Sequence, residues 1–494
     1  MKPWEIIALC FILILTFLIR IPFLAEPFET DQGIYSYLAW GWEHGKVLYR
    51  DLVDNKPPLV FVFYRIIFKL FGYSVQDIHL TYSLLAVLTT FVFYWLARSI
   101  FKPGIALISA FLYGLFSGGA LIAGSFANAE NLMVLFIIFA FYCFWRAYQE
   151  RKNFLFVFGG IFIGLAAMTK QSGLFEGMGI SLFLYFVFGD KGNRALALKR
   201  ISLVWLGMGM VFAFIWVCLV RSGLEKDFIQ STIRYGLFYS RAAGVQQSTI
   251  NFLHALKWTP RENFPLWILG GWGAILAFKK KEKLFLFLAI WMIFAFLGVA
   301  VSGRFYHQYF IQFIPPLVLV ATYTLQTLFW QKESGKRKRL IGALALIAAI
   351  GIFFGAQWNY YFKYSPTDSL IHRRGSLVRP DLVKGTNQLV SYIRERTKPD
   401  EYIYIWGLWP EVYFLSQRYA SSKYAFLASR GIMIKWFKSL VQEQVWQDTA
   451  KNNPKFFIID YYFADLISPD LNKYLRENYV YDTKIAGCEV LVRR

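Results

Sequence analysis

The stretch LMVLFIIFAFYCFW (Leu132–Trp145) contains no charged side chain, and neither do IIALCFILILTFL (Ile6–Leu18) and LIGALALIAAIGIFFG (Leu340–Gly355). A helix needs roughly 17–25 apolar residues to cross a bilayer, and apolar runs recur along most of the chain. The composition agrees, because 57% of the 494 residues are hydrophobic and only 17% are charged, against about a quarter in a typical soluble protein. The sequence therefore predicts a polytopic α-helical membrane protein.

The apolar runs predict about eleven membrane crossings. One such run could be a buried core helix, but a long series of them indicates spanning helices. Two further pieces, Gly33–His44 and Lys56–Phe71, are expected to lie at the membrane interface. The predicted crossings are Glu5–Leu24, Val75–Phe101, Ile105–Ala123, Asn128–Tyr148, Phe154–Thr169, Leu174–Gly189, Ile201–Arg221, Asn263–Phe278, Leu284–Val301, Tyr306–Gln331 and Leu340–Ala356.

Lysine and arginine collect in every second loop between these crossings. Basic loops stay in the cytoplasm, so that side is predicted to be cytoplasmic and to hold the N-terminus. The C-terminus is then expected outside the inner (plasma) membrane, on the side of the two longest loops, residues 25–74 and 222–262. The basic loop residues are Arg98, Lys102, Arg146, Arg151, Lys152, Lys191, Arg194, Lys199, Arg200, Lys279, Lys280, Lys281, Lys283, Lys332, Lys336, Arg337, Lys338 and Arg339.

The net charge of +22 would suggest nucleic-acid binding in a soluble protein. Here much of the excess lies in the cytoplasmic loops, which meet anionic lipid head groups. Membrane lipids are therefore predicted partners and nucleic acid is not. Basic residues on the outer side could hold a lipid phosphate or contact head groups, and both interpretations stay open. They are Arg234, Arg241, Lys257, Arg261 and Arg304.

The composition changes after residue 356, where charged residues become frequent and apolar runs shrink to strand length. Alternating strands and helices predict a small α/β layer domain. We therefore expect a transmembrane domain at residues 1–356 and a soluble extracytoplasmic α/β domain at residues 357–494. Within the latter, Trp406, Trp409 and Glu411 are either sugar contacts or core residues. The expected helices are Lys384–Glu395, Ile432–Asp448 and Asp470–Glu477, and the strands Glu401–Trp406, Lys455–Asp460 and Glu489–Arg493.

The first outer loop, residues 25–74, carries the strongest chemical signal, PFETDQGIYSYLAWGWEHGKVLYRDLVDNKPPL. Tyr35 follows Asp31 by one helical turn and faces the same way. Asp51, Asp54 and Lys56 come next. Acidic clusters and a lysine at a membrane surface indicate a functional site, and the alternative is a solvated loop with ordinary ion pairs.

Three more polar groups lie at the outer ends of predicted crossings. Each alone has a structural explanation: an acidic cap at a helix N-terminus, a snorkelling lysine or a structural histidine. Together they map to one face, and ionisable residues near membrane depth usually line a cavity. They are Asn128 and Glu130, then Lys170, and finally Arg304, His307 and Tyr309.

The chain resembles bacterial membrane glycosyltransferases of the C-type fold, the family-39-like group related to protein O-mannosyltransferases and the aminoarabinose transferase. The acidic first loop carries this resemblance. Further matches are AENLM, GLAAMTKQSGL and GRFYHQYFIQFIPPL in the helical part and DEYIYIWGLWPEVYFLSQR in the soluble part. The loop motif points to the superfamily and does not specify the sugar or the acceptor.

The resemblance implies an inverting transfer of sugar from a polyprenyl-phosphate donor on the outer face of the membrane. Asp31 matches the general base that deprotonates the acceptor hydroxyl, and Lys56 matches the lysine of the family's KPP element. Lys170, Arg304 and His307 would be candidates for holding the donor phosphate.

Glu130 falls where many relatives carry a second acidic residue. Tyr35, Asn128 and Tyr309 complete the expected substrate-binding set. Many protein O-mannosyltransferases have an Asp–Glu pair in the first loop, whereas here Glu29 precedes Asp31 by two and Gln32 follows it. This departure favours a lipid or glycan acceptor. Some relatives use a divalent metal, but the sequence offers no convincing ligand set, so no cofactor is predicted.

Two other classes of protein deserve comparison. A transporter or flippase of lipid-linked substrates would also have many helices and buried charges, but it should show broken helices or internal repeats near the midplane. A non-enzymatic assembly or sensor protein would explain an outer domain on a membrane anchor, but not the acidic loop. A glycosyltransferase accounts for both the outer domain and the acidic loop.

Overall fold

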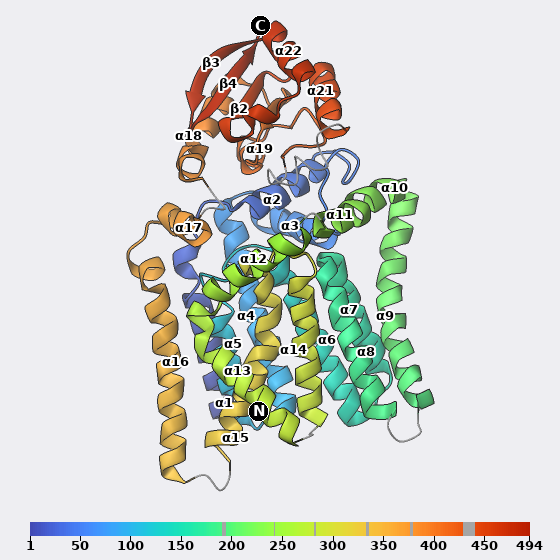
Figure 1. Cartoon of the computed structure of the whole chain (residues 1–494), viewed down its shortest axis with the longest axis vertical. Helices are drawn as coiled ribbons and strands as arrows, with labels where there is room; N and C mark the ends of the chain where they lie inside the picture. Colours follow the sequence, from blue (N-terminus) through green and yellow to red (C-terminus); the bar gives the residue numbers. More distant parts are fainter. Residues whose placement is uncertain (190–193, 242, 281–282, 332–334, 376–378, 428–439) are drawn as a thin grey trace.

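The computed structural model describes the chain except for residues 190–193, 242, 281–282, 332–334, 376–378 and 428–439. A bundle of long helices forms one end of the molecule and a small sheet with its helices forms the other (Figure 1). Shorter helices lie between the two. Lys191, Lys281 and Lys332 of the predicted cytoplasmic loops lie outside the described residues.

Each predicted crossing coincides with a helix. Seven described helices are long and apolar enough to span a membrane, and α5 and α7 are shorter apolar helices. The protein is thus a multi-pass membrane protein, whereas the count of eleven crossings stays a prediction. The helices are α1 (Pro3–Leu18), α4 (Val75–Ile100), α5 (Pro103–Phe116), α6 (Ala129–Glu150), α7 (Phe154–Thr169), α8 (Leu174–Gly189), α9 (Arg194–Arg221), α13 (Pro260–Lys280), α14 (Lys283–Ala300), η4 with α15 (His307–Phe313, Ile314–Phe329) and α16 (Lys336–Phe362).

Two predicted crossings end earlier than expected. α1 stops at Leu18, and a short 3₁₀ turn, η1 (Ile21–Phe23), follows. α5 stops at Phe116, because Gly118 and Gly119 weaken the helix there and Ala123 adopts a positive φ of 58°. Residues 117–128 therefore form a compact outer turn, which becomes part of the site.

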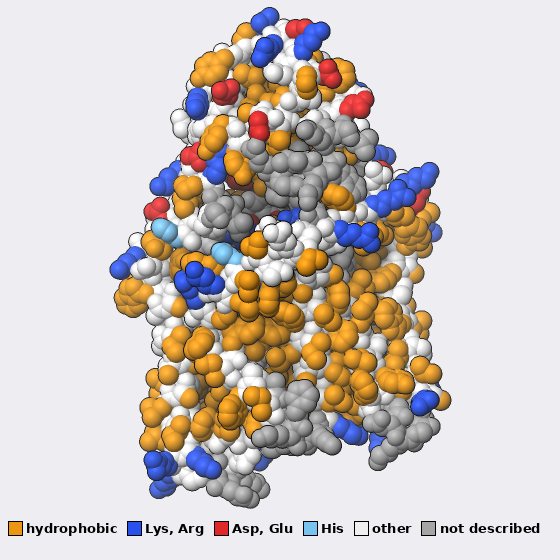
Figure 2. Space-filling model, in the orientation of Figure 1, with side chains coloured by type: hydrophobic (Ala, Val, Ile, Leu, Met, Phe, Trp, Pro, Cys, Tyr) orange, Lys and Arg blue, Asp and Glu red, His pale blue; other side chains and the backbone are white. Residues whose placement is uncertain are grey.

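Small residues and aromatic stacking hold the bundle together. A Cβ on Gly160 of α7 would collide with the Val204 carbonyl of α9, and one on Gly207 would collide with the Val157 carbonyl. Such close backbone approach is typical of helix pairs in membranes. Apolar side chains cover the outside of the bundle in Figure 2, with lysine and arginine beyond its lower end.

The layer between the bundle and the sheet consists of short helices. The predicted interfacial segments Gly33–His44 and Lys56–Phe71 are helical, in α2 (Thr30–Glu43) and α3 (Leu59–Phe71). The loop 222–262 forms further helices that the sequence analysis does not predict, because their apolar residues alternate with polar ones. They are α10 (Glu225–Phe228), the π-helical η3 (Ile229–Arg234), α11 (Tyr235–Arg241) and α12 (Gly244–Trp258), and α17 (Pro366–Arg374) joins the same layer.

The C-terminal sheet has the strand order β1-β2-β4-β3. β1 pairs parallel with β2, with Ile403 opposite Phe456, and the two remaining pairings are antiparallel. The predicted strands at 401–406, 455–460 and 489–493 are confirmed, whereas β3 is missed because its polar residues give no apolar run. The strands are β1 (Ile403–Trp406), β2 (Phe456–Asp460), β3 (Tyr479–Ile485) and β4 (Cys488–Arg493).

Four α-helices of the described residues accompany the sheet. The predicted helices at 384–395 and 470–477 are confirmed, and the one at 432–448 lies partly outside the described residues, with its described part in α21. Whether the chain divides into domains at residue 356 stays a prediction, since α16 runs on to Phe362. The helices are α18 (Pro380–Arg396), α19 (Glu411–Ser416), α21 (Leu440–Asn452) and α22 (Pro469–Asn478).

The C-terminal part of the chain, which consists of the sheet with α18, α19, α21 and α22, docks on α2 through α19. Gly33 lies directly against the backbone of Glu411, where any Cβ would clash. The Ala420 N–H donates a 2.9 Å hydrogen bond to the Tyr37 hydroxyl, and the Tyr37 ring lies 5.0 Å from that of Tyr413. Glycine at position 33 thus permits a contact that fixes the C-terminal part against the first outer loop.

Trp406 and Trp409 are core residues rather than exposed sugar contacts. Both are almost fully buried. The Trp406 indole donates to the Phe463 carbonyl at 2.9 Å, and the Trp409 indole donates to the Thr386 hydroxyl at 3.1 Å. Their hydrogen bonds stabilise the fold of the C-terminal part.

Candidate functional site

A cavity of about 280 Å³ lies between the outer ends of the membrane helices and the C-terminal part. Its walls come from the first outer loop, from α6, from the η3–α11 segment, from η4 and α17, and from the C-terminal part. Segments far apart in the sequence therefore meet around one cavity. The acidic and basic residues on its walls are Glu29, Asp31, Asp54, Lys56, Glu130 and Arg374.

Asp31 enters the cavity from the first turn of α2. Glu29 caps this helix: its Oε2 accepts the Asp31 N–H at 3.0 Å, and its own N–H donates to Gln32 Oε1 at 2.9 Å. This reciprocal pair is a capping box. It fixes the backbone on both sides of Asp31, and a carboxylate in this first turn is also favoured by the helix dipole.

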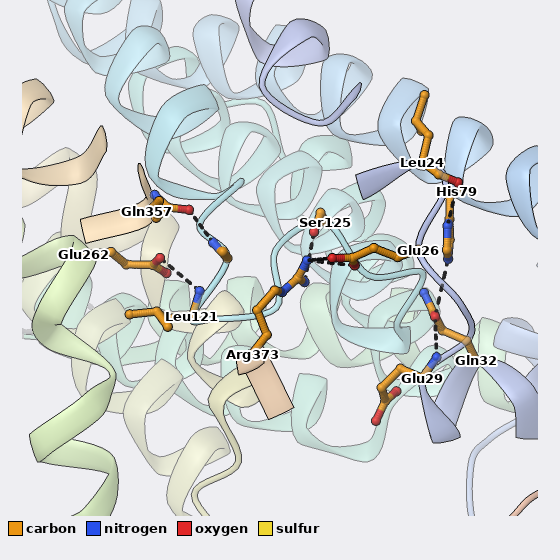
Figure 3. A network of polar contacts seen from close by, with 11 residues as sticks. Leu24, Glu26, Glu29, Gln32, His79, Leu121, Ser125, Glu262, Gln357 and Arg373 are labelled. Atoms are coloured by element: carbon orange, nitrogen blue, oxygen red, sulfur yellow. Dashed lines mark hydrogen bonds and ion pairs between the residues drawn. The ribbon is translucent and has the colours of Figure 1, made fainter. Parts of the chain in front are cut away.

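Gln32 continues this capping inward. Its Oε1 lies 3.4 Å from His79 Nε2 on α4, and His79 Nδ1 lies 3.2 Å from the Leu24 carbonyl oxygen (Figure 3). Gln32 therefore has a structural role. It connects the start of α2 to a membrane helix.

Tyr35 lies one turn beyond Asp31 but does not line the cavity. It is buried, and its ring packs edge-on against Phe61 at 5.9 Å and Tyr64 at 5.8 Å. Burial, followed by the charge of Asp31, raises the pKa of its hydroxyl well above the usual value. Tyr35 therefore holds α2 against α3, close behind the carboxylate.

Lys56 lines the cavity from the segment that precedes α3. Asp54 Oδ1 accepts the Lys56 N–H at 2.7 Å, and Lys56 Nζ donates to Asn55 Oδ1 at 2.9 Å. Burial lowers the pKa of Lys56, but the charges of Asp54, Asp31 and Glu130 outweigh this effect and raise it above its usual value. The ammonium is therefore firmly charged and faces the cavity.

Three other predicted residues meet across the helix ends. Lys170 Nζ, after α7, donates to Glu130 Oε1 of α6 at 2.6 Å. The same ammonium lies 3.5 Å from the centre of the Tyr309 ring of η4. Glu130 and Tyr309 line the cavity, whereas Lys170 is committed to these two neighbours.

The remaining predicted residues lie off the cavity wall. Asn128 is buried at the start of α6, and its side-chain nitrogen and oxygen have no hydrogen-bond partner among the described residues. The Arg304 guanidinium lies 4.8 Å from the centre of the Tyr239 ring, which itself lines the cavity. His307 begins η4, next to the lining residues Tyr306 and Gln308.

Arg374 is the site residue that the sequence analysis missed. It ends α17, forms an ion pair with Glu29, and donates from Nη1 to Gln308 Oε1 at 3.1 Å. Only 8% of the Arg374 side chain and 2% of the Glu29 side chain are exposed. The sequence around it, HRRG, is a short basic run without a family motif, so no local signal marks it.

A second layer of polar contacts supports the turn at residues 117–128 (Figure 3). The Glu262 carboxylate on α13 accepts the N–H groups of Leu121 and Ile122, each at 2.9 Å. Gln357 Oε1 on α16 accepts the Ala120 N–H at 2.6 Å. Helices distant in sequence thereby fix the turn that leads into α6 and Glu130.

Arg373 ties the same turn to the first outer loop. Its Nη1 donates to both oxygens of Glu26, at 3.1 and 2.9 Å, and its Nη2 donates to the Ser125 hydroxyl at 3.0 Å (Figure 3). Both charged side chains are almost completely buried. Removing one partner of such a pair is strongly destabilising, so Arg373 anchors α17 in place.

The lining carboxylates differ in what they contact. Glu29 and Glu130 form ion pairs, and Asp54 accepts a backbone N–H. No described residue forms a hydrogen bond or an ion pair with the Asp31 carboxylate, whereas its backbone N–H is held by Glu29. A carboxylate of this kind is available to accept a proton from a bound molecule.

Among the residues that the structure describes, no group of three or more His, Cys, Asp or Glu side chains is arranged to hold a metal ion. Lys56 and Arg374 provide positive charge on the cavity wall.

Known proteins share parts of this sequence and its fold. Residues 55–220 match the sequence model of the family described as dolichyl-phosphate-mannose-protein mannosyltransferase. An uncharacterised protein of Aquifex aeolicus is 23% identical over 327 residues, which are 63% of this chain and 60% of that protein. The match thus spans less than two thirds of the curated relative.

Solved structures are similar over the whole chain. One is ArnT of Cupriavidus metallidurans bound to undecaprenyl phosphate, with a TM-score of 0.59 and 14% identity over 99% of this chain and 97% of that one. Another is the oligosaccharyltransferase AglB of Archaeoglobus fulgidus with an inhibitory peptide and a dolichol-phosphate, with a TM-score of 0.61 and 14% identity over 100% and 74%. The chain therefore has the C-type glycosyltransferase fold that its sequence predicts.

Proposed function

We propose that this protein is a membrane glycosyltransferase that takes its sugar from a lipid-phosphate donor. The observation that carries the proposal is Asp31, a carboxylate on the cavity wall that forms no hydrogen bond or ion pair with a described residue. The fold and the family match at residues 55–220 support it. Titratable side chains with shifted pKa values that line a cavity, such as Glu29, Asp54 and Lys56, are typical of a functional site.

The proposed reaction is a direct displacement at the anomeric carbon. An acceptor hydroxyl attacks this carbon, the new bond to the acceptor oxygen forms, and the bond to the phosphate oxygen breaks. The hydroxyl proton passes to the Asp31 carboxylate, and the polyprenyl phosphate leaves with the electron pair of the broken bond. A single displacement inverts the anomeric configuration.

Lys56 is the first candidate for the donor phosphate. Its ammonium lines the cavity and donates a hydrogen bond there to the neutral Asn55 side chain. A fixed cation beside the leaving oxygen stabilises the charge that develops as the bond breaks. Lys170 is paired with Glu130, so we assign it mainly to orienting Glu130, with Arg304 and His307 as outer contacts for the donor.

We further propose that the reaction takes place on the outer face of the inner (plasma) membrane, with a lipid or glycan as the acceptor. The alternation of basic loops supports this orientation. The cavity lies where the bundle meets the C-terminal part, so a lipid tail could remain among the helices while the head group reaches Asp31. One assay can identify both the donor sugar and the acceptor.

The test uses the full-length protein in nanodiscs, with undecaprenyl phosphate carrying mannose, other hexoses or pentoses as donors and a membrane lipid and glycan extract as acceptor. Release of undecaprenyl phosphate is measured for the wild type and for Asp31→Asn. We expect the variant to lose about 10²–10⁴-fold in rate, the typical contribution of a general base, and to retain donor binding.

Asp51→Asn is the matched control, because Asp51 lies in the same loop but not on the cavity wall. It should retain nearly full activity. An Asp31→Asn protein as active as the wild type would remove the general base from the proposal. A wild-type protein that moves donor lipid across a vesicle membrane without releasing undecaprenyl phosphate would favour a flippase instead.

A further inference from the structure

Glu29 and Arg374 form a buried ion pair directly beside Asp31. Glu29 has two carboxylate oxygens with separate partners: Oε2 accepts the Asp31 N–H at 3.0 Å, and Oε1 is held by Arg374. The Glu29 side chain is only 2% exposed. Its position therefore depends on these contacts rather than on water.

Arg374 is itself fixed from several directions. Its guanidinium bridges Glu29 of α2 and Gln308 of η4, and it lies 5.5 Å from the centre of the Phe126 ring. The preceding residue, Arg373, anchors the end of α17 through Glu26 and Ser125. The planar fork of arginine can hold two acceptors in fixed directions, and the anchored helix determines where that fork points.

We propose that Arg374 is a positioning residue: by holding Glu29, it fixes the first turn of α2 and so orients the Asp31 carboxylate toward the cavity. The inference rests on the proposed function, in which Asp31 is the general base. It gives the segment between α16 and the C-terminal part an indirect role in catalysis. Arg374 acts through Glu29 and not on the substrate.

The charges around Glu29 explain why the pairing matters. They are those of Arg374, Asp31, Lys56 and Glu411. Burial raises the pKa of Glu29 to about 7, the charge of Arg374 opposes this, and the charge of Asp31 adds to it. Without Arg374, the buried Glu29 carboxyl would be held as the neutral acid at neutral pH, and the contact that fixes its Oε1 would be lost.

A double-mutant cycle tests the proposal. Arg374→Gln removes the cation, and Glu29→Gln removes the charge of Glu29 but keeps an oxygen that can accept the Asp31 N–H. Initial rates with undecaprenyl-phosphate-linked sugar are measured for the wild type, both single variants and the double variant. We expect Arg374→Gln alone to lower kcat about 10–100-fold, as a misplaced catalytic group does, and to cost less than about threefold in the Glu29→Gln background.

Three measurements separate positioning from other roles. The affinity for undecaprenyl phosphate alone should be unchanged in Arg374→Gln. The acid limb of the kcat/KM profile should move to higher pH in Arg374→Gln, because the Glu29 carboxylate then lacks its cation. It should return to its wild-type position in the double variant, in which this carboxylate is replaced by an amide. Arg374→Lys, which retains the charge but not the fork, should fall between wild type and Arg374→Gln.

Arg379→Gln is the matched control. Arg379 also forms ion pairs, with Asp381 and Asp460 of the C-terminal part, but does not line the cavity. It should leave kcat and the pH profile unchanged. Melting curves of all variants identify any that fail to fold, and Arg374→Lys then carries the comparison.

The possible outcomes are distinct. Equal losses from Arg374→Gln in both backgrounds, or weaker binding of undecaprenyl phosphate, would show that Arg374 binds substrate and would overturn the inference while leaving the proposed function in place. An unchanged pH profile in Arg374→Gln with a lower melting temperature would reduce Arg374 to a purely structural role. A wild-type protein that consumes none of the donors overturns the proposed function and this inference with it.

Discussion

Asp31 and Glu29 are two residues apart, but their surroundings give them different tasks. Glu29 is enclosed by Arg374 and by the backbone of α2, so its carboxylate interacts with protein groups rather than with the cavity. The Asp31 carboxylate faces the cavity with no described partner. An acidic pair in a sequence therefore does not by itself identify the base, because the burial and the partner of each carboxylate decide its role.

The ion pair between Lys170 and Glu130 should contribute to the stability of the folded protein. Glu130 is buried and Lys170 nearly so, and breaking a buried pair costs about 3–5 kcal/mol because the other charge is left unpaired. Lys170→Met should therefore lower the melting temperature markedly, and adding Glu130→Gln should restore much of it. Thermal unfolding in detergent measures both. If Lys170→Met melts like the wild type, the pair does not hold α6 and α7 together.

At this scale the sequence predicted the site in part. Asp31, Lys56, Glu130 and Tyr309 do line one cavity, because each lies at the end of an apolar run and such ends gather at one face. Arg374 could not be found in this way, since its partner Glu29 is 345 residues away. Pairing across such a distance depends on packing and not on local pattern.

The elements around α2 show how the C-terminal part reaches the site. α19 lies against α2 at Gly33, where the two backbones approach so closely that no other side chain fits. Glu411, the first residue of α19, has a buried Oε2 without a hydrogen-bond partner among the described residues. A carboxyl in this position is stable only when it is neutral.

This contact predicts a pH dependence of stability. Burial raises the pKa of Glu411 to about 8 and that of Glu29 to about 7, against 4.5 for an ordinary glutamate. The folded protein thus binds these protons more tightly than the unfolded chain, so the stabilisation is complete below about pH 4.5 and is lost as the pH rises through 7–8. The melting temperature should fall between about pH 4.5 and pH 8 and then level off.

Glu411→Gln is the control for this effect. The amide cannot ionise, so the variant should lose less stability over the same pH range. Parallel curves for wild type and variant would mean that Glu411 does not contribute. Asp482→Asn, in the exposed contact with Tyr392 on the far side of the sheet, should follow the wild type.

The predictability of the elements follows from their composition. Membrane helices are largely apolar, so hydropathy locates each of them, although some ends differ by several residues. β3 and α12 are missed because the polar residues that face solvent interrupt their apolar positions. The stop of α5 at Phe116 is a third case, since a membrane-length apolar run hides a turn that depends on Gly118 and Gly119.

On the scale of the whole molecule, the orientation in the membrane can be tested directly. The basic loops predict that residue 153 is cytoplasmic and residue 246 is outside. In a background with Cys10, Cys143, Cys218 and Cys488 replaced by alanine, Gln246→Cys should react with a membrane-impermeant maleimide in intact cells. Asn153→Cys should react only after the membrane is opened. Both positions are exposed, so the reverse pattern would invert the topology.

The cavity wall is shared between parts of the chain that are synthesised at different times. Asp31 belongs to the first outer loop, whereas Arg374 and the lining residues Leu408, Tyr424 and Phe426 come from the last third of the sequence. At about 5–20 residues per second, the ribosome needs roughly 17–70 seconds to make the 345 residues between Glu29 and Arg374. A nascent chain therefore carries Asp31, the proposed general base, long before Arg374 can hold Glu29 beside it, and we expect activity to appear only when insertion into the membrane is almost complete.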